Sequence, residues 1–89
     1  GWKKHNKMVL NLVVISGEVE FVVFNGTEFE AVTLSQQNYQ RLTVQPNNWV
    51  AFRGVGTDKN LILNIASIEH DSNEAVNCGL EDITYEWSM

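Results

Sequence analysis

The 89-residue sequence has few of the features that mark several large classes of protein. It contains 6 lysines and arginines against 11 aspartates and glutamates, which gives a formal net charge of -5 at pH 7. Surfaces that bind nucleic acid are basic, because lysine and arginine must displace the counterions of the phosphate backbone. The composition therefore predicts a protein that binds no nucleic acid and, for the same reason, no anionic membrane surface.

Long apolar stretches and cysteine pairs are also lacking. The longest apolar run, residues 9–15, is interrupted by Asn11 and is far shorter than the roughly 20 residues that span a bilayer. No signal-peptide pattern is recognisable at the start of the sequence. The single cysteine, Cys78, cannot form an internal disulfide. We interpret it as a non-catalytic thiol and expect a cytoplasmic protein.

What the sequence does contain is a succession of short strand patterns joined by turn residues. Apolar, β-branched and alternating segments predict strands at residues 8–15, 18–24, 28–34, 39–44, 49–53 and 60–67. Short strands at this spacing favour an all-β sandwich or jelly roll. We expect residues 1–89 to form a single domain, with one short helical turn at residues 71–74 and an aromatic tail at residues 79–89 that packs over the barrel.

Two local patterns in this series give sharper predictions. Asn25-Gly26 favours a hairpin with a type I′ turn, because that turn needs positive φ at both of its central residues. In the segment before it, Phe21 and its apolar neighbours alternate with Glu18 and Glu20. This alternation predicts a half-buried strand with the glutamates on the opposite face.

Two turn-strand units of the chain resemble the metal-binding motifs of cupins. Gly17 matches the final glycine of the first motif. Its three ligand positions then fall on Lys3, His5 and Leu10, and the histidine of the second motif falls on Val50. Only His5 can bind a transition metal, which usually takes three or four side-chain ligands. We therefore expect a cupin-like fold with no metal and no cofactor.

Longer strings carry a closer resemblance. The segments NLVVISGEVEFVV, VTLSQQNYQRLTV and IEHDSNEA, in this order and spacing, are similar to the dTDP-4-dehydrorhamnose 3,5-epimerase family, in particular to its divergent dTDP-sugar isomerase-related branch. The resemblance covers residues 2–82. It implies a cupin-like jelly roll (a double-stranded β-helix) that lacks its first strands here. It also implies a metal-independent epimerase or isomerase of nucleotide-sugar and polysaccharide biosynthesis, with a dTDP-sugar or related small carbohydrate as its ligand.

The family's catalytic residues do not carry over to the matching positions. In the family, a histidine oriented by an aspartate removes a proton next to a ketone, a lysine stabilises the enolate oxygen and a tyrosine returns a proton. By the resemblance, these three positions fall on Lys3, Asn11 and Asn64. The acidic partner could come from Glu81 or Asp82. The resemblance thus implies an epimerase-related protein whose standard catalytic residues are missing.

Two interpretations of these substitutions remain open. In the first, Lys3, His5, Asn11, Arg53 and Asn64 line a polar pocket for a nucleotide-sugar. His5, or Lys3 in its deprotonated form, would then be the base and Asn11 an oxyanion donor. In the second, the asparagine amides satisfy local backbone groups and Lys3 is solvated. The protein would then be a non-catalytic sugar- or nucleotide-binding module, or a structural domain.

The remaining predictions concern two side chains and the assembly. Trp49 is next to the emptied ligand position Val50, and we expect it to stack on the base or the sugar ring. We interpret His70, in a polar turn, as a surface histidine. Because a small barrel that lacks its first strands has open sheet edges, pairing between subunits would cover them, and the sequence predicts a homodimer.

Overall fold

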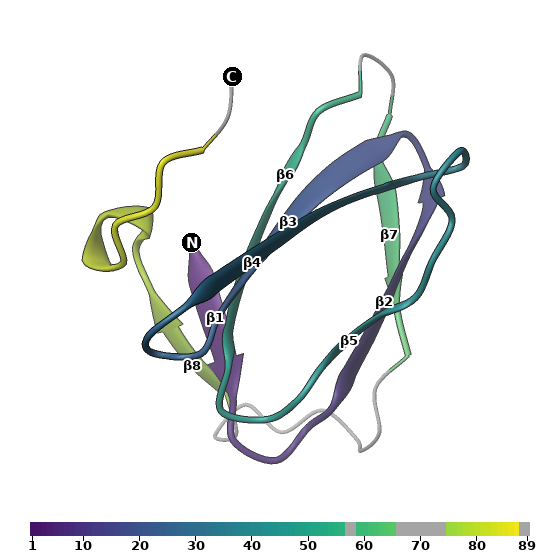
Figure 1. The fold of residues 1–89 in the computed structure, drawn as a ribbon. Coiled ribbons are helices and arrows are strands. Elements are labelled where there is room, and N and C mark those ends of the chain that lie inside the picture. Colours follow the sequence, from purple (N-terminus) through teal and green to yellow (C-terminus); the bar gives the residue numbers. More distant parts are fainter. Residues whose placement is uncertain (57–58, 66–74, 88–89) are drawn as a thin grey trace.

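The computed structural model describes residues 1–56, 59–65 and 75–87, which form an almost entirely β structure (Figure 1). The elements in chain order are β1 (Trp2–His5), β2 (Leu10–Ser16), β3 (Glu18–Phe24), β4 (Phe29–Ser35), β5 (Leu42–Val44), β6 (Trp49–Gly54), β7 (Leu61–Asn64), β8 (Ala75–Cys78) and the short 3-10 helix η1 (Leu80–Asp82).

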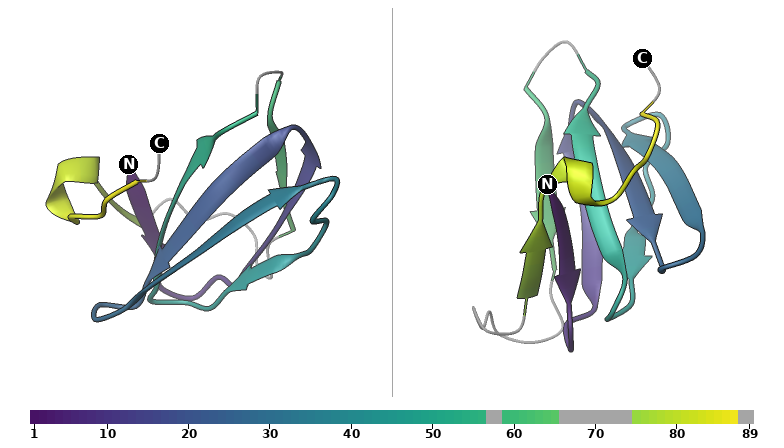
Figure 2. Two further views of the ribbon diagram at one scale, coloured as in Figure 1. Left: turned by 45° about the horizontal axis from the view of Figure 1, so that its top comes forward. Right: turned by 90° about the vertical axis from the view of Figure 1, so that its left-hand side faces the viewer.

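The strands make two antiparallel sheets that face each other as a sandwich (Figures 1 and 2). The five-stranded sheet has the order β4-β3-β6-β1-β8, and the three-stranded sheet has the order β5-β2-β7. From β4 onwards, successive strands switch from one sheet to the other, which is the connectivity of a jelly roll. The all-β, cupin-like fold predicted from the sequence is therefore confirmed.

The main core lies between the two sheets. Every second residue of a strand points to the same face, so the inward residues of β2 and β3 meet across the sandwich. The buried members of this core are Met8, Leu10, Leu12, Val14, Val19, Phe21, Leu34, Val44 and Val50. Burying each such side chain contributes about 1.5–3 kcal/mol, which makes this layer the principal stabilising element of the fold.

A second core covers the outer face of the five-stranded sheet. It is formed by Trp2, Val22 and Ala51, against which Ile83, Tyr85 and other aromatic residues pack. Figure 2 shows the C-terminal segment, in yellow, lying across this side of the sheet. The prediction that the tail packs over the barrel is confirmed for residues 79–87.

The covered outer face corrects one prediction from the alternation in β3. Glu20 was expected on a solvated face, but its residue is only 8% exposed. Its Oε1 accepts a hydrogen bond from Arg53 Nε at 2.8 Å. The Arg53 guanidinium in turn lies 5.7 Å from the ring centre of Trp87, on the C-terminal segment. Strand β3 is thus buried on both faces over much of its length, because a segment distant in sequence covers the side that carries Glu20.

The hairpin between β3 and β4 is confirmed, but its turn is not of type I′. Among the described non-glycine residues only Asn47 has a positive φ, of 68°, whereas Asn25 would also need one. Instead, the Asn25 N–H donates to the Glu28 carbonyl at 3.2 Å, which closes a longer loop. The Asn25 Oδ1 also accepts hydrogen bonds from the N–H groups of Thr27 and Glu28, at 2.9 and 2.8 Å. The asparagine side chain therefore shapes this loop, as in an Asx-turn.

The strand predicted at residues 39–44 is shorter in the structure, where β5 begins only at Leu42. The preceding loop is held against the edge of β4 instead. The Asn38 side-chain amide donates to the Thr33 carbonyl at 2.8 Å, and the Ser35 N–H donates to the Asn38 carbonyl at 3.4 Å. These bonds occupy edge groups of β4 that a neighbouring strand would otherwise use.

The strand predicted at residues 60–67 corresponds to β7, which ends at Asn64. The helical turn predicted at residues 71–74 and the histidine His70 lie outside the described residues.

Candidate functional site

A cavity of about 570 Å³ lies between the two sheets, on the side of β1, β8 and β7. Its volume is in the range of small-molecule binding sites. The lining residues come from β1, β2, β6, β7 and β8 and their flanks: Gly1, Trp2, Lys3, His5, Met8, Leu10, Leu12, Val50, Phe52, Ile62, Asn64, Asn77 and Cys78. Most of the wall is apolar, and polar groups are contributed by Lys3, His5 and the two asparagines. No aspartate or glutamate of the described residues is part of this lining.

Strand β1 positions two of the predicted site residues in the cavity. In the sheet, Lys3 lies opposite Val50 of β6 and Asn77 of β8. Residues opposite each other share a face, and all three line the cavity. His5 lies two residues further along the same face and is only 8% exposed. Its carbonyl accepts a hydrogen bond from the Asn47 N–H at 2.7 Å, which fixes the end of the strand.

The two asparagines that were predicted at the site have different positions. Asn64 lies opposite Leu12 in the three-stranded sheet and lines the cavity, and its Oδ1 also accepts from the Asn11 N–H at 3.2 Å. Asn11 is not in the lining. Its Nδ2 donates to the Ile65 carbonyl at 3.1 Å, and its Oδ1 accepts from Thr43 Oγ1 at 3.0 Å. The Asn11 amide therefore satisfies strand partners, as the second interpretation of the sequence supposes.

Trp49 and Arg53 lie on the other face of β6, away from the cavity. Trp49 packs against the outer core, with Lys4 Nζ 4.9 Å from the centre of its ring. Arg53 pairs with Glu20 on the same outer face. The structure thus brings Lys3, His5 and Asn64 together at one cavity. Trp49 and Arg53 lie on the outer face of the five-stranded sheet, and the ligand-binding roles predicted for these two residues stay predictions.

The aromatic residue that β6 contributes to the cavity is Phe52, whereas the sequence favours Trp49 for that role. Phe52 lines the cavity and is 60% exposed, while its ring centre lies 5.8 Å from that of the fully buried Phe21. The signal that could have found it is the period of two along β6. Val50 and Phe52 share the inward face, whereas Trp49, adjacent to Val50 in sequence, must point to the opposite side.

The C-terminal end of β8 contributes a thiol to the cavity wall. Burial raises the pKa of the Cys78 thiol, and the carboxylates of Asp82 and Glu81 raise it further. A thiol with a raised pKa is protonated and weakly nucleophilic at neutral pH. Neither carboxylate belongs to the cavity lining, and Asp82 Oδ2 accepts from the Gly79 N–H at 2.9 Å instead.

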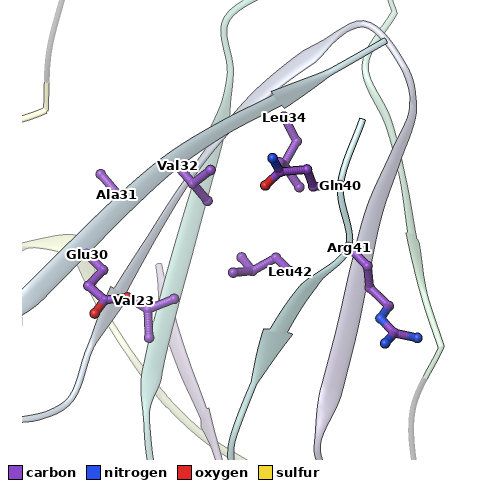
Figure 3. Close-up of a pocket in the computed structure, with 8 residues that line it drawn as sticks. All are labelled: Val23, Glu30, Ala31, Val32, Leu34, Gln40, Arg41 and Leu42. Atoms are coloured by element: carbon purple, nitrogen blue, oxygen red, sulfur yellow. The ribbon is translucent and has the colours of Figure 1, made fainter. Parts of the chain in front are cut away.

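A second, smaller cavity of about 140 Å³ lies between β4 and β5, at the opposite side of the sandwich. Figure 3 shows Leu42 of β5 pointing toward Val23 and Val32 of the facing sheet, while the Arg41 side chain extends away from them. The cavity is below the volume of an ordinary ligand site, and none of the predicted site residues lines it. We regard it as a gap between the open edges of the two sheets.

Within residues 1–56, 59–65 and 75–87, no group of three or more histidine, cysteine, aspartate or glutamate side chains is arranged to hold a metal ion. No helix in the described part of the chain has the length and apolar character needed to cross a membrane.

The fold and its cavity define an all-β, cupin-like sandwich with a cavity between its sheets. Comparison with solved structures identifies a dTDP-sugar isomerase from Desulfovibrio desulfuricans G20, with a TM-score of 0.85 and 26% identity over 89% of this chain and 55% of that one. Two further matches are sugar 3,4-ketoisomerases at 20% identity. The WlaRB TDP-quinovose 3,4-ketoisomerase from Campylobacter jejuni has a TM-score of 0.75 and is matched over 85% of this chain and 57% of that one.

The second ketoisomerase match is QdtA from Thermoanaerobacterium thermosaccharolyticum, in a mutant form in complex with TDP-4-keto-6-deoxyglucose. It has a TM-score of 0.74, over 83% of this chain and 52% of that one. No protein-family model matches the sequence, and no curated protein is similar to it. The chain spans about half the length of these structures. The resemblance predicted from the sequence is confirmed at the level of the fold: the chain has the cupin-like fold of these dTDP-sugar isomerase and ketoisomerase structures, from which its sequence has diverged.

Proposed function

We propose that this chain binds a dTDP-sugar or a related small carbohydrate in the cavity between its sheets, as a divergent protein of nucleotide-sugar and polysaccharide biosynthesis. The observation that carries the proposal is that Lys3, His5 and Asn64 converge on one largely apolar cavity. A lysine suits the negative charge of a phosphate or an enolate, and an apolar wall suits the carbon face of a deoxysugar. The solved structures with the same fold include one in complex with a TDP-sugar.

If the chain retains catalysis, the cavity offers a reduced form of metal-independent epimerase or isomerase chemistry. His5 would remove a proton from the carbon next to a ketone, and the Lys3 ammonium would stabilise the enolate oxygen that forms. The two side chains share one face of β1 two residues apart, so their Cα atoms are separated by about 6.6 Å. Reprotonation of the same carbon on its opposite face, by water, then completes an epimerisation, while His5 releases its proton to solvent and no electrons are exchanged with another reactant.

Deuterium wash-in tests this chemistry directly. We expect TDP-4-keto-6-deoxyglucose to gain deuterium next to its ketone in the presence of the protein, and a His5→Gln variant to slow that exchange by about 10²–10⁴-fold, the usual contribution of a general base. Lys3→Met should slow it as well. Lys4→Met is the matched control, because Lys4 lies on the opposite face of the same strand, beside Trp49. Exchange no faster than in buffer alone would remove the catalytic proposal.

The alternative is a non-catalytic module that binds the same class of ligand. It is favoured by Asn11, which occupies the family's lysine position and supplies no cation there. The Asn11 amide is instead engaged in hydrogen bonds to strand partners. Isothermal titration calorimetry with the TDP-sugar would then give binding without deuterium exchange. Lys3→Met should weaken that binding while Lys4→Met leaves it unchanged, and binding insensitive to Lys3 would contradict this alternative too.

We further propose that residues 1–89 act as one domain, form a homodimer in the cytoplasm, and bind neither nucleic acid nor membranes. The dimer is supported by the open edges of the sandwich, since among the described strands β8, β5 and β7 each pair on one side only, and the loop after β4 covers only part of the edge of that strand. The outer face of the three-stranded sheet also exposes Ile15, Leu63 and Ile65. Sedimentation equilibrium should give twice the mass of the chain, and a monomer at high concentration would contradict the proposal.

A further inference from the structure

Phe52 combines two properties, a place in the wall of the candidate cavity and a largely exposed side. It lines the cavity of about 570 Å³, yet the residue is 60% exposed, whereas its cross-strand neighbour Phe21 is fully buried. The two rings are tilted by 46° with their centres 5.8 Å apart, so Phe21 supports one side of the Phe52 ring. The rest of the ring is open to the cavity and to solvent.

The position of Phe52 relative to Lys3 follows from the register of the sheet. Lys3 lies opposite Val50, so Phe52 is the diagonal neighbour of Lys3 on the inward face. Diagonal neighbours on adjacent strands have Cα atoms about 7–8 Å apart, within reach of aromatic and long side chains. An ammonium group and an exposed aromatic face therefore stand side by side on the same wall of the cavity.

We propose that Phe52 is the platform on which a planar ring of the ligand stacks, while Lys3 receives an anionic group attached to that ring. The ligand class is an anion that bears an aromatic or heteroaromatic ring, such as a nucleotide. The inference deepens the proposed function, on which it rests for the location of the ligand, and it assigns to Phe52 the stacking role that the sequence suggested for Trp49. Aromatic stacking of this kind accepts any base, because every base has a π-face.

The test compares ligands with and without a ring, by calorimetry. In Phe52→Leu, we expect the affinity for TDP to fall by about 5- to 150-fold, the range of a lost base-aromatic stack. The affinity for inorganic pyrophosphate, which has no ring, should change less than twofold. Phe52→Tyr, which keeps the aromatic face, should bind TDP like the natural sequence. Tyr39→Leu is the matched control, because Tyr39 is 63% exposed but does not line the cavity.

The outcomes separate this inference from the proposed function. If the natural protein binds TDP-sugars but Phe52→Leu binds TDP unchanged, or loses TDP and pyrophosphate equally, the platform is refuted and the function stands. If TDP-sugars do not bind but UDP or AMP binds in a Phe52-dependent way, the nucleotide-sugar function is refuted and the platform stands. If no ring-bearing anion among TDP, UDP and AMP binds, both are refuted. Circular dichroism of Phe52→Leu confirms folding, since the mostly exposed ring contributes little to the core.

Discussion

The ion pair between Arg53 and Glu20 allows a sharp test of the division between the inner and outer faces of the five-stranded sheet. Replacing Arg53 by methionine keeps most of the aliphatic side chain but removes the charge that faces the Glu20 carboxylate at 2.8 Å. The carboxylate then stays in a largely buried position without this partner. We expect Arg53→Met to destabilise the fold and to leave ligand affinity unchanged.

The size of the effect follows from the exposure of the two side chains, which is 33% for Arg53 and 10% for Glu20. Removing one partner of a fully buried pair costs about 3–5 kcal/mol, because an unpaired charge is left behind. A fully exposed pair contributes only about 0.2–1 kcal/mol. An intermediate loss of about 2 kcal/mol is expected here, and in a domain of this length it lowers the Tm by about 8–16 °C.

Urea unfolding followed by circular dichroism measures this loss. The double variant Arg53→Met with Glu20→Leu should recover at least half of it, because replacing both partners of a buried pair by apolar groups is often nearly neutral. A single variant within about 0.5 kcal/mol of the natural sequence would refute the stabilising role of the pair. A tenfold loss of TDP affinity with unchanged stability would instead place Arg53 in the ligand site.

Two further predictions concern the cavity wall and a turn. Because the pKa of Cys78 is raised, its thiolate forms only at alkaline pH, so labelling by a disulfide reagent should be slow at pH 7 and accelerate as the pH rises. Asp82→Asn lowers that pKa and should shift the pH-rate profile to lower pH, and an unchanged profile would contradict the assigned cause. Gly17, between β2 and β3, and Gly26, between β3 and β4, both have positive φ. Gly17→Ala should lower the Tm of the protein more than Gly26→Ala, because of these two positions only Gly17 would place the new Cβ against Asn60. Equal losses would show that backbone strain alone acts.

The sequence predicts the fold well because the strand period is local information. The bounds of β3 are those predicted from its alternation, and the following hairpin is also correct. The predicted turn type is wrong because the Asn25 side chain accepts hydrogen bonds from the N–H groups of Thr27 and Glu28, which stabilise a longer loop than the two-residue type I′ turn. The burial of Glu20 depends on a segment more than thirty residues further along the chain, and periodicity within one strand carries no information about such a contact.

The candidate site is predicted less completely, for a related reason. Lys3 and His5 share a face of β1, and both line the cavity as the resemblance implies. Trp49 was chosen because it adjoins Val50 in sequence, but neighbours in a strand point to opposite faces, and Phe52 lines the cavity instead. Asn11 shows a further difficulty, since only the strand pairing reveals that its amide is already engaged.

The two faces of strand β1 have different surroundings, the cavity on one side and the outer core on the other. Lys3 and His5 face the cavity, while Trp2 packs into the outer core and Lys4 lies over Trp49. Mutations at successive codons of this short segment therefore meet different selective pressures. Substitutions at Lys3 and His5 can change the ligand with little effect on the outer core, and substitutions at Lys4 can adjust stability with little effect on the ligand, whereas Trp2 both packs into the outer core and lines the cavity. Directed evolution of a new specificity should accordingly begin at residues 3 and 5, while residue 4 is reserved for restoring stability lost on the way.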